Sequence, residues 1–299
     1  MIGEPVTVLD THASEAFVET KSIRGVVERA LMYLECGNPV NLSGPPGAGK
    51  TTLALHIADK LGRPIVFLSG DEQLGSSDMA GGVRGYHRRR VVDRFVHLVL
   101  KTEDDIVERW VDSRVAAACR SGFTLIYDEY TRSRAEANNP LLSILEERIL
   151  VLPGEREQEG YIRVDPRFRV IFTSNPAEYS GSHKQPDALR DRMVTIHLKG
   201  YDEESEIAIT RAHSGLDEAV VRWVVRLIGR AKEGPFTKLS TRACVMIAKV
   251  MASYELRPDK HDQLLYAVCR DVIASPCDEI TPAMEADLRA LWAESFTSP

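Results

Sequence analysis

The stretch Asn41–Leu61, NLSGPPGAGKTTLALHIADKL, decides the fold of this 299-residue chain. A short apolar segment leads into a loop rich in glycine and proline, and a helical pattern begins at Lys-Thr-Thr. The loop fits G-x-x-x-x-G-K-[ST], a pattern that wraps the phosphates of a nucleotide with backbone N–H groups at the start of a helix. The residues that we expect to bind the nucleotide are Gly44, Pro45, Pro46, Gly47, Ala48, Gly49, Lys50, Thr51 and Thr52.

Two side chains of this loop have expected roles of their own. Lys50 is predicted to contact the β- and γ-phosphates, and Thr51 to ligate Mg²⁺. ATP and Mg²⁺ are therefore the expected ligands. The alternative is an ordinary glycine-rich turn before a helix, which the position after an apolar strand disfavours. The pattern leaves open whether the nucleotide serves a small-molecule kinase, a switch or a mechanical machine.

Short apolar runs rich in β-branched residues alternate with helical patterns along the first 200 residues. Runs of this kind suit strands that are covered on both faces, and strands separated by helices favour a parallel, doubly wound sheet. We predict an α/β fold with a parallel five-stranded sheet, whose strands lie at 39–44, 64–70, 123–129, 169–175 and 193–200. Ligands of such sheets bind at the carboxyl ends of the strands, so the chemistry is expected there.

No convincing strand follows residue 200, and the remaining segments have helical periodicity, including a last helix with Thr281 as N-cap and Pro282 in its first position. We predict a nucleotide-binding core over 1–200 and a small helical lid domain over 201–299. The core is expected to carry a helix with an insert at about 71–122 and a hairpin at about 149–164.

Acidic and amide side chains end two of the predicted strands. The strand TLIYDE places Asp128 where it could hold Mg²⁺ through water, and Glu129 where it could polarise the water that attacks the γ-phosphate. A kinase has less need of such a second carboxylate. Asn175, at the end of VIFTSN, could hydrogen-bond the γ-phosphate or that water, although Ser-Asn also commonly marks a turn.

Three arginines could complete the site. Arg190 and Arg192 precede the fifth predicted strand, where an arginine at a subunit edge could reach a neighbour's nucleotide and raise the rate by about 10³–10⁵. From the residues alone, either arginine could take this role. Arg242 begins a helix of the second domain and could face the phosphates. Each of the three could instead be an ordinary surface arginine at the end of a helix.

Composition excludes several classes of protein. A net charge of −6 argues against bulk nucleic-acid binding. The five cysteines contain no C-x-x-C pair and indicate a reducing cytosol. The N-terminus lacks a signal-peptide pattern. No apolar run is close to the length of about 20 residues that a membrane-spanning helix needs. We expect a soluble cytoplasmic protein.

The order of these landmarks resembles that of the AAA+ ATPases: phosphate loop, Asp-Glu strand, asparagine strand, edge arginine and lid arginine. The resemblance implies a ring of identical subunits, a hexamer in particular, with sites between subunits and a helical lid. The glycine-interrupted segment 71–122 and the two β-like pieces around Leu152-Pro153-Gly154 resemble the MoxR-type branch of this class. In that branch such protrusions contact the client.

A narrower resemblance is carried by YTRSRAEANN (130–139), FTSNPAEYSG (172–181) and STRAC (240–244), and extends over about residues 18–250. These segments resemble the gas vesicle protein N family of MoxR-type ATPases. By motif match, this resemblance favours Arg192, in the Asp-Arg pair, as the arginine that reaches the neighbour's nucleotide, with Arg190 second. The resemblance implies an ATPase that acts on gas vesicle shell or accessory proteins and helps to enlarge the shell, in the cytoplasm and at the vesicles. The alternatives are an activator that remodels a metalloenzyme and a nucleotide-gated scaffold with little turnover.

Overall fold

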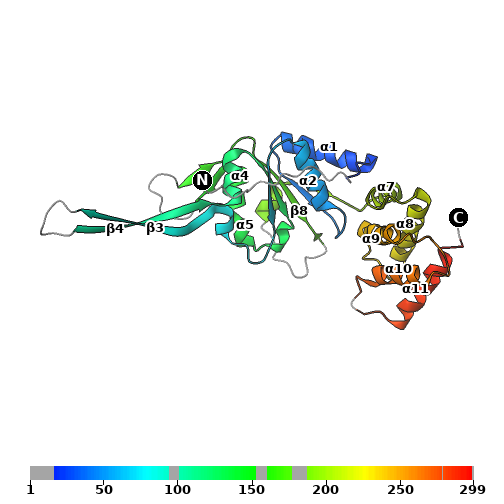
Figure 1. Ribbon diagram of the computed structural model, residues 1–299. Helices are drawn as coiled ribbons and strands as arrows, with labels where there is room; N and C mark the ends of the chain where they lie inside the picture. Colours follow the sequence, from blue (N-terminus) through cyan, green and yellow to red (C-terminus); the bar gives the residue numbers. More distant parts are fainter. Residues whose placement is uncertain (1–16, 94–100, 153–159, 177–186, 278, 298–299) are drawn as a thin grey trace. The chain divides into compact units, whose positions relative to one another are not determined.

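The computed structural model describes residues 17–93, 101–152, 160–176, 187–277 and 279–297 (Figure 1). Its strands are β1 (Val40–Ser43), β2 (Ile65–Ser69), β3 (Gly81–Asp93), β4 (Lys101–Asp112), β5 (Thr124–Asp128), β6 (Ile149–Val151), β7 (Tyr161–Arg163), β8 (Arg169–Ser174) and β9 (Val194–His197). Its helices are α1 (Lys21–Glu35), α2 (Lys50–Lys60), α3 (Ser76–Ala80), α4 (Arg114–Ser121), the 3-10 helix η1 (Tyr130–Arg132), α5 (Ala135–Glu146), α6 (Asp187–Asp191), α7 (Glu203–Ser214), α8 (Glu218–Glu233), α9 (Thr241–Ser253), α10 (Gln263–Ala274) and α11 (Pro282–Glu294).

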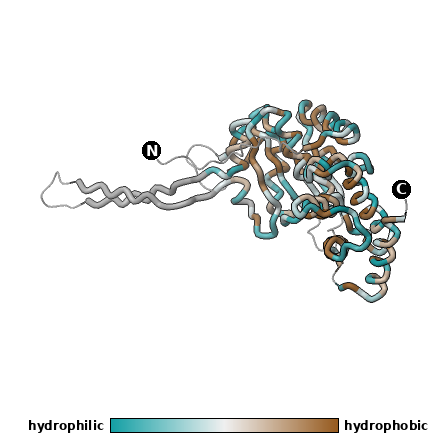
Figure 2. The backbone as a smooth tube through the Cα atoms, turned by 45° about the vertical axis from the view of Figure 1, so that its right-hand side comes forward, coloured by the Kyte–Doolittle hydropathy of each residue, from teal (hydrophilic) through white to brown (hydrophobic). Residues whose placement is uncertain are grey.

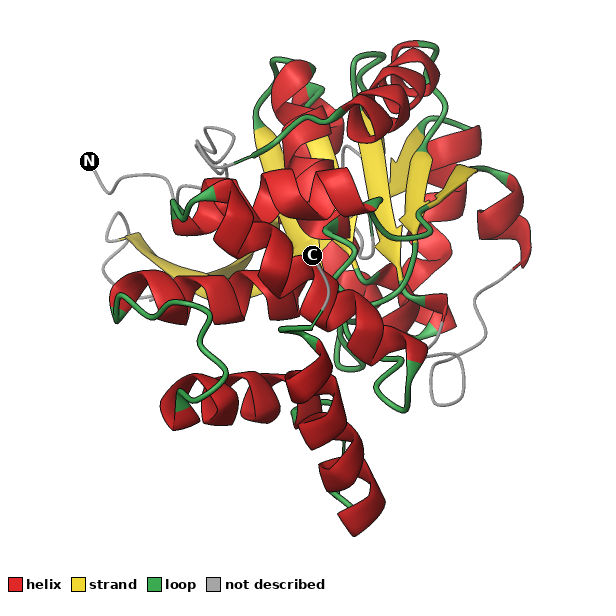
Figure 3. Cartoon of the chain, turned by 90° about the vertical axis from the view of Figure 1, so that its right-hand side faces the viewer, coloured by secondary structure: helices red, strands yellow, loops and turns green. Residues whose placement is uncertain are grey.

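The central element is a five-stranded sheet in the order β2-β5-β8-β1-β9. Strand β2 pairs in parallel with β5, and β5 pairs in parallel with β8. All residues of β1 are buried, and β5 and β8 are buried over most of their length, which explains why these strands are continuous apolar runs in the sequence. In Figure 3 the strands, in yellow, lie among the helices, in red. The predicted α/β fold with a parallel five-stranded sheet is confirmed.

The described residues form two compact units that are discontinuous in sequence. Unit 1 contains 32–41 and 58–195, and unit 2 contains 17–31, 42–57 and 196–297. Each unit has an apolar core of its own. Figure 2 shows in brown where hydrophobic residues lie along the backbone. Tyr127, Tyr130 and Phe172 pack together in the core of unit 1. The predicted domain boundary at residue 200 stays a prediction, because neither unit is one continuous segment.

Helices alone make up the regular structure that the described residues show after β9. Helix α8 buries an apolar stripe that includes Val224 and Ile228, and these residues join the core of unit 2. The predicted start of the last helix is confirmed: the Thr281 side chain accepts a hydrogen bond from the Met284 N–H, and Pro282 is the first helical residue.

The helix with an insert that was expected at about 71–122 is wrong for most of its length. Residues up to Asp112 belong to β4, which pairs antiparallel with β3, and only α4 is helical. The register places Arg89 opposite Asp105 and Arg90 opposite Asp104, so opposite charges occupy facing positions of the hairpin. Backbone pairing with β3 makes this segment a strand, although its own propensity also allows helix. The insert is a long hairpin that extends away from α4 and α5 (Figure 1).

A second, short hairpin is formed by β6 and β7 within the range 149–164. The two strands pair antiparallel, with Val151 opposite Tyr161. These two side chains are 60% and 48% exposed, which is unusual for large apolar residues. Pro153 and Gly154 of the expected turn lie outside the described residues.

None of the helices that the structure describes combines the length and the apolar composition needed to cross a lipid bilayer.

Candidate nucleotide site

The glycine-rich loop follows β1 and leads into α2, as the motif predicts. Lys50 begins the helix with its side chain turned back into the loop, where its Nζ donates hydrogen bonds of 2.9 Å to the carbonyl oxygens of Gly44 and Pro45. Gly47 and Gly49 have φ values of 74° and 71°. This left-handed backbone is easily reached only by glycine, so the residue types of the motif fit the turns that the loop makes.

Side chains from the segment after β9 pack directly on this loop. A Cβ atom at Gly47 would lie 2.2 Å from the Oγ of Ser240, and one at Gly49 would lie 2.5 Å from the hydroxyl of Tyr201. Ser240 is the residue before α9, and Tyr201 lies shortly before α7. Within unit 2 the loop therefore contacts both helical segments, and a larger residue at either glycine would displace these contacts.

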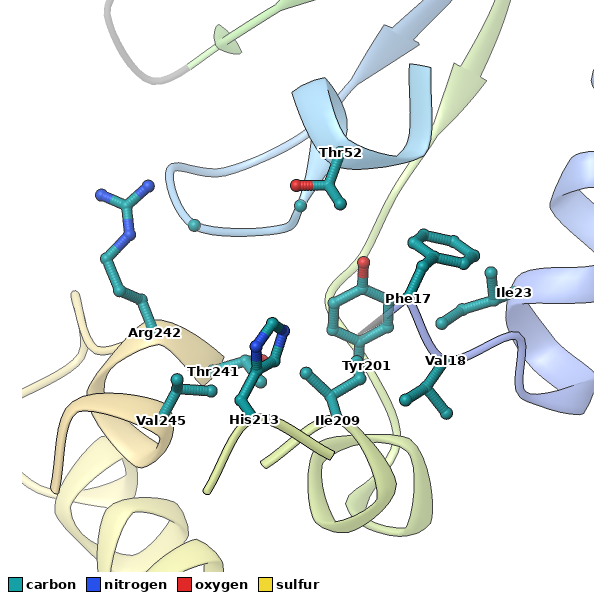
Figure 4. Close-up of a pocket in the computed structure, with 12 residues that line it drawn as sticks. Phe17, Val18, Ile23, Thr52, Tyr201, Ile209, His213, Thr241, Arg242 and Val245 are labelled. Atoms are coloured by element: carbon teal, nitrogen blue, oxygen red, sulfur yellow. The ribbon is translucent and has the colours of Figure 1, made fainter. Parts of the chain in front are cut away.

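A cavity of about 220 Å³ opens beside the loop (Figure 4). All of its lining residues belong to unit 2. They are Phe17, Val18, Ile23, Gly47, Gly49, Thr52, Tyr201, Ile209, His213, Thr241, Arg242 and Val245. The lining is mainly apolar away from the loop and polar beside it, which suits a planar heterocycle attached to phosphates.

The N-terminal segment before α1 supplies part of this lining. The ring of Phe17 stacks on His56 of α2, with centroids 3.8 Å apart and planes 18° from parallel. The Nε2 of His56 lies 3.0 Å from a carboxylate oxygen of Glu19. Sequence reasoning missed this wall of the cavity, and the only signal for it was the apolar pair Phe17-Val18 in a polar segment.

Arg242 lies where the sequence analysis expected it in the chain, in the first turn of α9. Its side chain is exposed, lines the cavity and extends toward the glycine-rich loop in Figure 4. Two titratable neighbours stay uncharged near neutral pH. Burial, and secondarily Lys249, lowers the pKa of His213, and burial raises the pKa of Tyr201. Arg242 is thus the cationic side chain among the residues that line this cavity.

The two acids occupy the end of β5 in unit 1. The hydroxyl of Thr173, on β8, donates a hydrogen bond of 2.6 Å to Asp128 Oδ1 and accepts one of 2.8 Å from the Glu129 N–H. Glu129 has a φ of 51°, which is uncommon for a residue other than glycine. Its carboxylate accepts a hydrogen bond of 2.8 Å from Arg132 of η1. The backbone and the side chain of Glu129 are thus both tethered.

Asn175 follows β8 directly and is 3% exposed. Because β8 pairs in parallel with β5, Asn175 and the acids emerge from neighbouring strands at the same end of the sheet. In unit 1 the structure therefore gathers these polar residues at the carboxyl ends of strands, as expected for an α/β site.

The edge arginines differ in their surroundings. Arg190 is exposed at the end of α6. Arg192 forms an ion pair with Glu146 at the end of α5, with a hydrogen bond of 2.9 Å from its Nε, and also donates to the carbonyl oxygen of Ala188 at 2.6 Å. Sequence reasoning did not predict this ion pair, which gives the favoured arginine a partner within the same chain.

The structure thus brings the loop, Lys50 and Arg242 together in unit 2, and Asp128, Glu129 and Asn175 in unit 1. The described residues hold no cluster of three or more histidine, cysteine or acidic side chains for a metal. Mg²⁺ in nucleotide enzymes does not need such a cluster, because it keeps several waters and takes one or two protein oxygens in addition to phosphate. Thr51 and Asp128 are oxygen donors of the required kind.

The fold and these residues define the class of protein. A family model described as AAA domain (dynein-related subfamily) matches residues 39–193. A RuvB mutant from Thermotoga maritima has the same fold, with a TM-score of 0.50 and 19% identity over 85% of this chain and 68% of that one. The protein is an AAA+ ATPase, an enzyme that binds and hydrolyses ATP.

Within this class, two relatives identify a narrower group. Gas vesicle ATPase GvpN of Ancylobacter aquaticus is 44% identical over 271 residues, which cover 90% of this chain and 76% of that protein. Gas vesicle ATPase GvpN of Haloferax mediterranei is 40% identical over 262 residues, or 87% of this chain and 75% of that protein. The chain belongs to the gas vesicle ATPase GvpN family. The family expected from the sequence motifs is confirmed.

Proposed function

We propose that this protein couples ATP hydrolysis to the assembly or enlargement of gas vesicles by remodelling their shell or accessory proteins. It acts in the cytoplasm as a ring of identical subunits, a hexamer in particular. Membership of the gas vesicle ATPase GvpN family supports a role at gas vesicles. The observation that carries the coupling is the position of Glu129 directly after Asp128, with its backbone N–H held by Thr173, because a second carboxylate placed in this way is suited to turnover and a passive scaffold does not need one.

Nucleotide binding is assigned to the glycine-rich loop and Lys50. The N–H groups of the loop and the Lys50 ammonium bind the phosphates, and the apolar end of the cavity receives the base, with Phe17 as one wall. Lys50 exchanges its present carbonyl partners in the loop for phosphate oxygens. Thr51 and Asp128, the latter through water, would hold Mg²⁺, which neutralises phosphate charge.

Hydrolysis is assigned to the strand ends of unit 1. Glu129 orients the attacking water and takes its proton, and Asn175 hydrogen-bonds that water or the γ-phosphate. For the first role the Glu129 carboxylate must turn away from Arg132. The pair is solvent-accessible, with side chains 36% and 59% exposed, so it gives little resistance to that change.

Two arginines sense the nucleotide in this proposal. Arg242 binds the phosphates from the lid of its own subunit, which links the nucleotide state to the position of the helical segment. Arg192 leaves Glu146 and reaches the nucleotide of the neighbouring subunit, with Arg190 as the second candidate. Binding and loss of the γ-phosphate then change contacts both within and between subunits.

The two hairpins of unit 1 are the proposed client contacts. The β6–β7 hairpin exposes Val151 and Tyr161 at facing positions, an apolar pair that could grip an amphipathic shell protein. On the long hairpin, Tyr86 and the basic run 88–90 belong to β3. The register sets Arg89 and Arg90 opposite acidic residues of β4, so the paired strands do not present basic residues alone. The β6–β7 hairpin, with its exposed apolar pair, is therefore the better-supported candidate for the client contact.

The proposal is tested in cells that make gas vesicles and lack their own copy of this gene. They are complemented with the wild type, with Glu129→Gln, or with Glu136→Gln, which changes an acid in the first turn of α5. Glu129→Gln should bind ATP, fail to hydrolyse it and leave the vesicles small, whereas Glu136→Gln should restore normal vesicles. Normal vesicles from a hydrolysis-deficient Glu129→Gln protein would favour the scaffold. Persistent ATP hydrolysis by this variant would remove Glu129 from its role.

A further inference from the structure

Thr173 is a buried hydroxyl placed between the two acids. It lies on β8 with no exposed surface. Phe172 pairs with Tyr127 in the parallel register of β8 and β5, so Thr173 follows at the level of Asp128. Its hydroxyl is hydrogen-bonded to the Asp128 carboxylate at 2.6 Å and to the Glu129 backbone N–H at 2.8 Å.

The direction of these two hydrogen bonds is fixed by the chemistry of the partners. An ionised carboxylate only accepts, so the single proton of the hydroxyl goes to Asp128. A backbone N–H only donates, so an oxygen lone pair of Thr173 accepts from Glu129. The two bonds thus depend on one hydroxyl, and losing it would release the Asp128 side chain and the Glu129 backbone together.

The Glu129 backbone has a particular need for such a tether. Its φ of 51° lies in the left-handed region, which a non-glycine residue occupies only when its surroundings hold it there. The bond to Thr173 is one such restraint, and it acts on the residue whose side chain has to reach a water. Asn175 lies two residues after Thr173, directly after the end of β8, so one short segment of chain carries both the tether and the amide.

We propose that Thr173 is a positioning residue for ATP hydrolysis, which sets Asp128 and Glu129 from the strand that leads to Asn175. The inference rests on the proposed roles of these acids and goes beyond them by naming the group that orients them. The competing view is that Thr173 merely satisfies buried polar atoms and stabilises the sheet. The two views differ in what happens when the hydroxyl is removed and the shape is kept.

The test compares Thr173→Val, which replaces the hydroxyl by a methyl group, with Thr173→Ser, which keeps the hydroxyl. A matched control is Thr124→Val on β5, because Thr124 is equally buried and its hydroxyl has no hydrogen-bond partner among the described residues. All variants are purified as full-length protein. Their kcat and KM for ATP, the binding of a fluorescent ATP analogue and the melting temperature are measured.

We expect Thr173→Val to lower kcat about 10–100-fold with nearly unchanged KM and analogue binding, since misplacing a reacting group by about 1 Å can lower the rate about 10²-fold. Thr173→Ser should recover most of the rate, and Thr124→Val should match the wild type. Without nucleotide, hydrogen exchange of the Glu129 amide should be faster in Thr173→Val than in Thr173→Ser.

The outcomes separate this inference from the proposed function. Wild-type kcat in folded Thr173→Val, alongside an inactive Glu129→Gln, would overturn the positioning role alone. An active Glu129→Gln would overturn the proposed catalytic role of that acid. If Thr173→Val does not fold, Thr173→Ala is compared with Thr173→Ser in the same assays, and equal kcat values for these two would also refute the inference.

Discussion

Gly70 and Glu129 are in direct backbone contact. A Cβ atom at residue 70 would lie 2.2 Å from the carbonyl oxygen of Glu129. The N–H of Gly70 also donates a hydrogen bond of 2.7 Å to the carbonyl oxygen of Asp128. The residue after β2 therefore supports the acid pair at the end of β5, and only a glycine leaves room for it.

Gly70→Ala should disturb both stability and turnover. The added methyl group must push the Glu129 backbone aside, and overpacking of this kind costs about 1–3 kcal/mol. We expect a lower free energy of unfolding in urea and a loss of ATP hydrolysis that is larger than the loss of ATP binding. Gly229→Ala is the control, because a Cβ atom at this position of α8 would meet nothing within 4 Å and alanine favours helix. Unchanged kcat in Gly70→Ala would show that the contact has no bearing on Glu129.

Lys50→Ala should remove ATP binding, in contrast to Glu129→Gln. The substitution deletes the ammonium group that is proposed to exchange its two loop carbonyl partners for phosphate oxygens. Charge-assisted hydrogen bonds are worth about 1.5–3 kcal/mol each, so binding should weaken by about 10²-fold or more. Calorimetric titration with Mg·ATP measures this, with Lys60→Ala at the other end of α2 as the control. Equal affinity in Lys50→Ala and Lys60→Ala would contradict the assignment.

Arg192→Ala should keep ATP binding and lose turnover. If Arg192 acts on a neighbour's nucleotide, mixing this variant with Lys50→Ala should restore part of the ATPase rate, because one subunit supplies the arginine and the other the intact pocket. Glu146→Ala should not lower the rate, since its carboxylate competes for Arg192. No rescue in mixed assemblies that demonstrably form would exclude the role in trans, and the same mixing with Arg190→Ala decides between the two arginines.

Phe17→Ala should weaken binding of the ATP base and leave the rate of hydrolysis nearly unchanged. Phe17 lines the apolar part of the cavity and stacks on His56, so its removal opens that wall. Removing a large apolar contact of about 1.5–3 kcal/mol should raise KM for ATP about tenfold or more with little change in kcat. Met32→Ala, on an exposed face of α1, is the control. A fall in kcat at unchanged KM would mean that Phe17 affects hydrolysis and not binding of the ATP base.

The cysteines should fall into two reactivity classes. Burial raises the pKa of Cys119, Cys244 and Cys269 to about 12, so almost none of these thiols is ionised at about pH 8. Cys36 is exposed and should react first with a thiol reagent, followed by the partly buried Cys277. Mass spectrometry after short labelling of the native protein measures this. Fast labelling of the three buried thiols without denaturant would mean that their surroundings open readily.

Local patterns were enough to predict the sheet and its residue types. Continuous burial of β1, β5 and β8 requires apolar runs in the sequence, and the phosphate loop has a spacing that few other structures require. The short polar ends of these strands indicated the carboxyl edge of the sheet as the place of the chemistry.

The hairpin β3–β4 shows where local patterns fail. Residues 104–112 fit a helix by themselves, and pairing with β3 makes them a strand. Such pairing depends on residues distant along the chain, so periodicity within one segment cannot reveal it.

By itself, the sequence determined the class of fold, the phosphate loop and the identity of the acids, because each of these depends on neighbours along the chain. Only the tertiary structure decided that Thr173 joins Asp128 to Glu129, that Gly70 supports Glu129, and that Arg192 pairs with Glu146. These contacts connect residues that are far apart in sequence, and their strength comes from distances of a few ångströms that are set when separate strands and helices pack together.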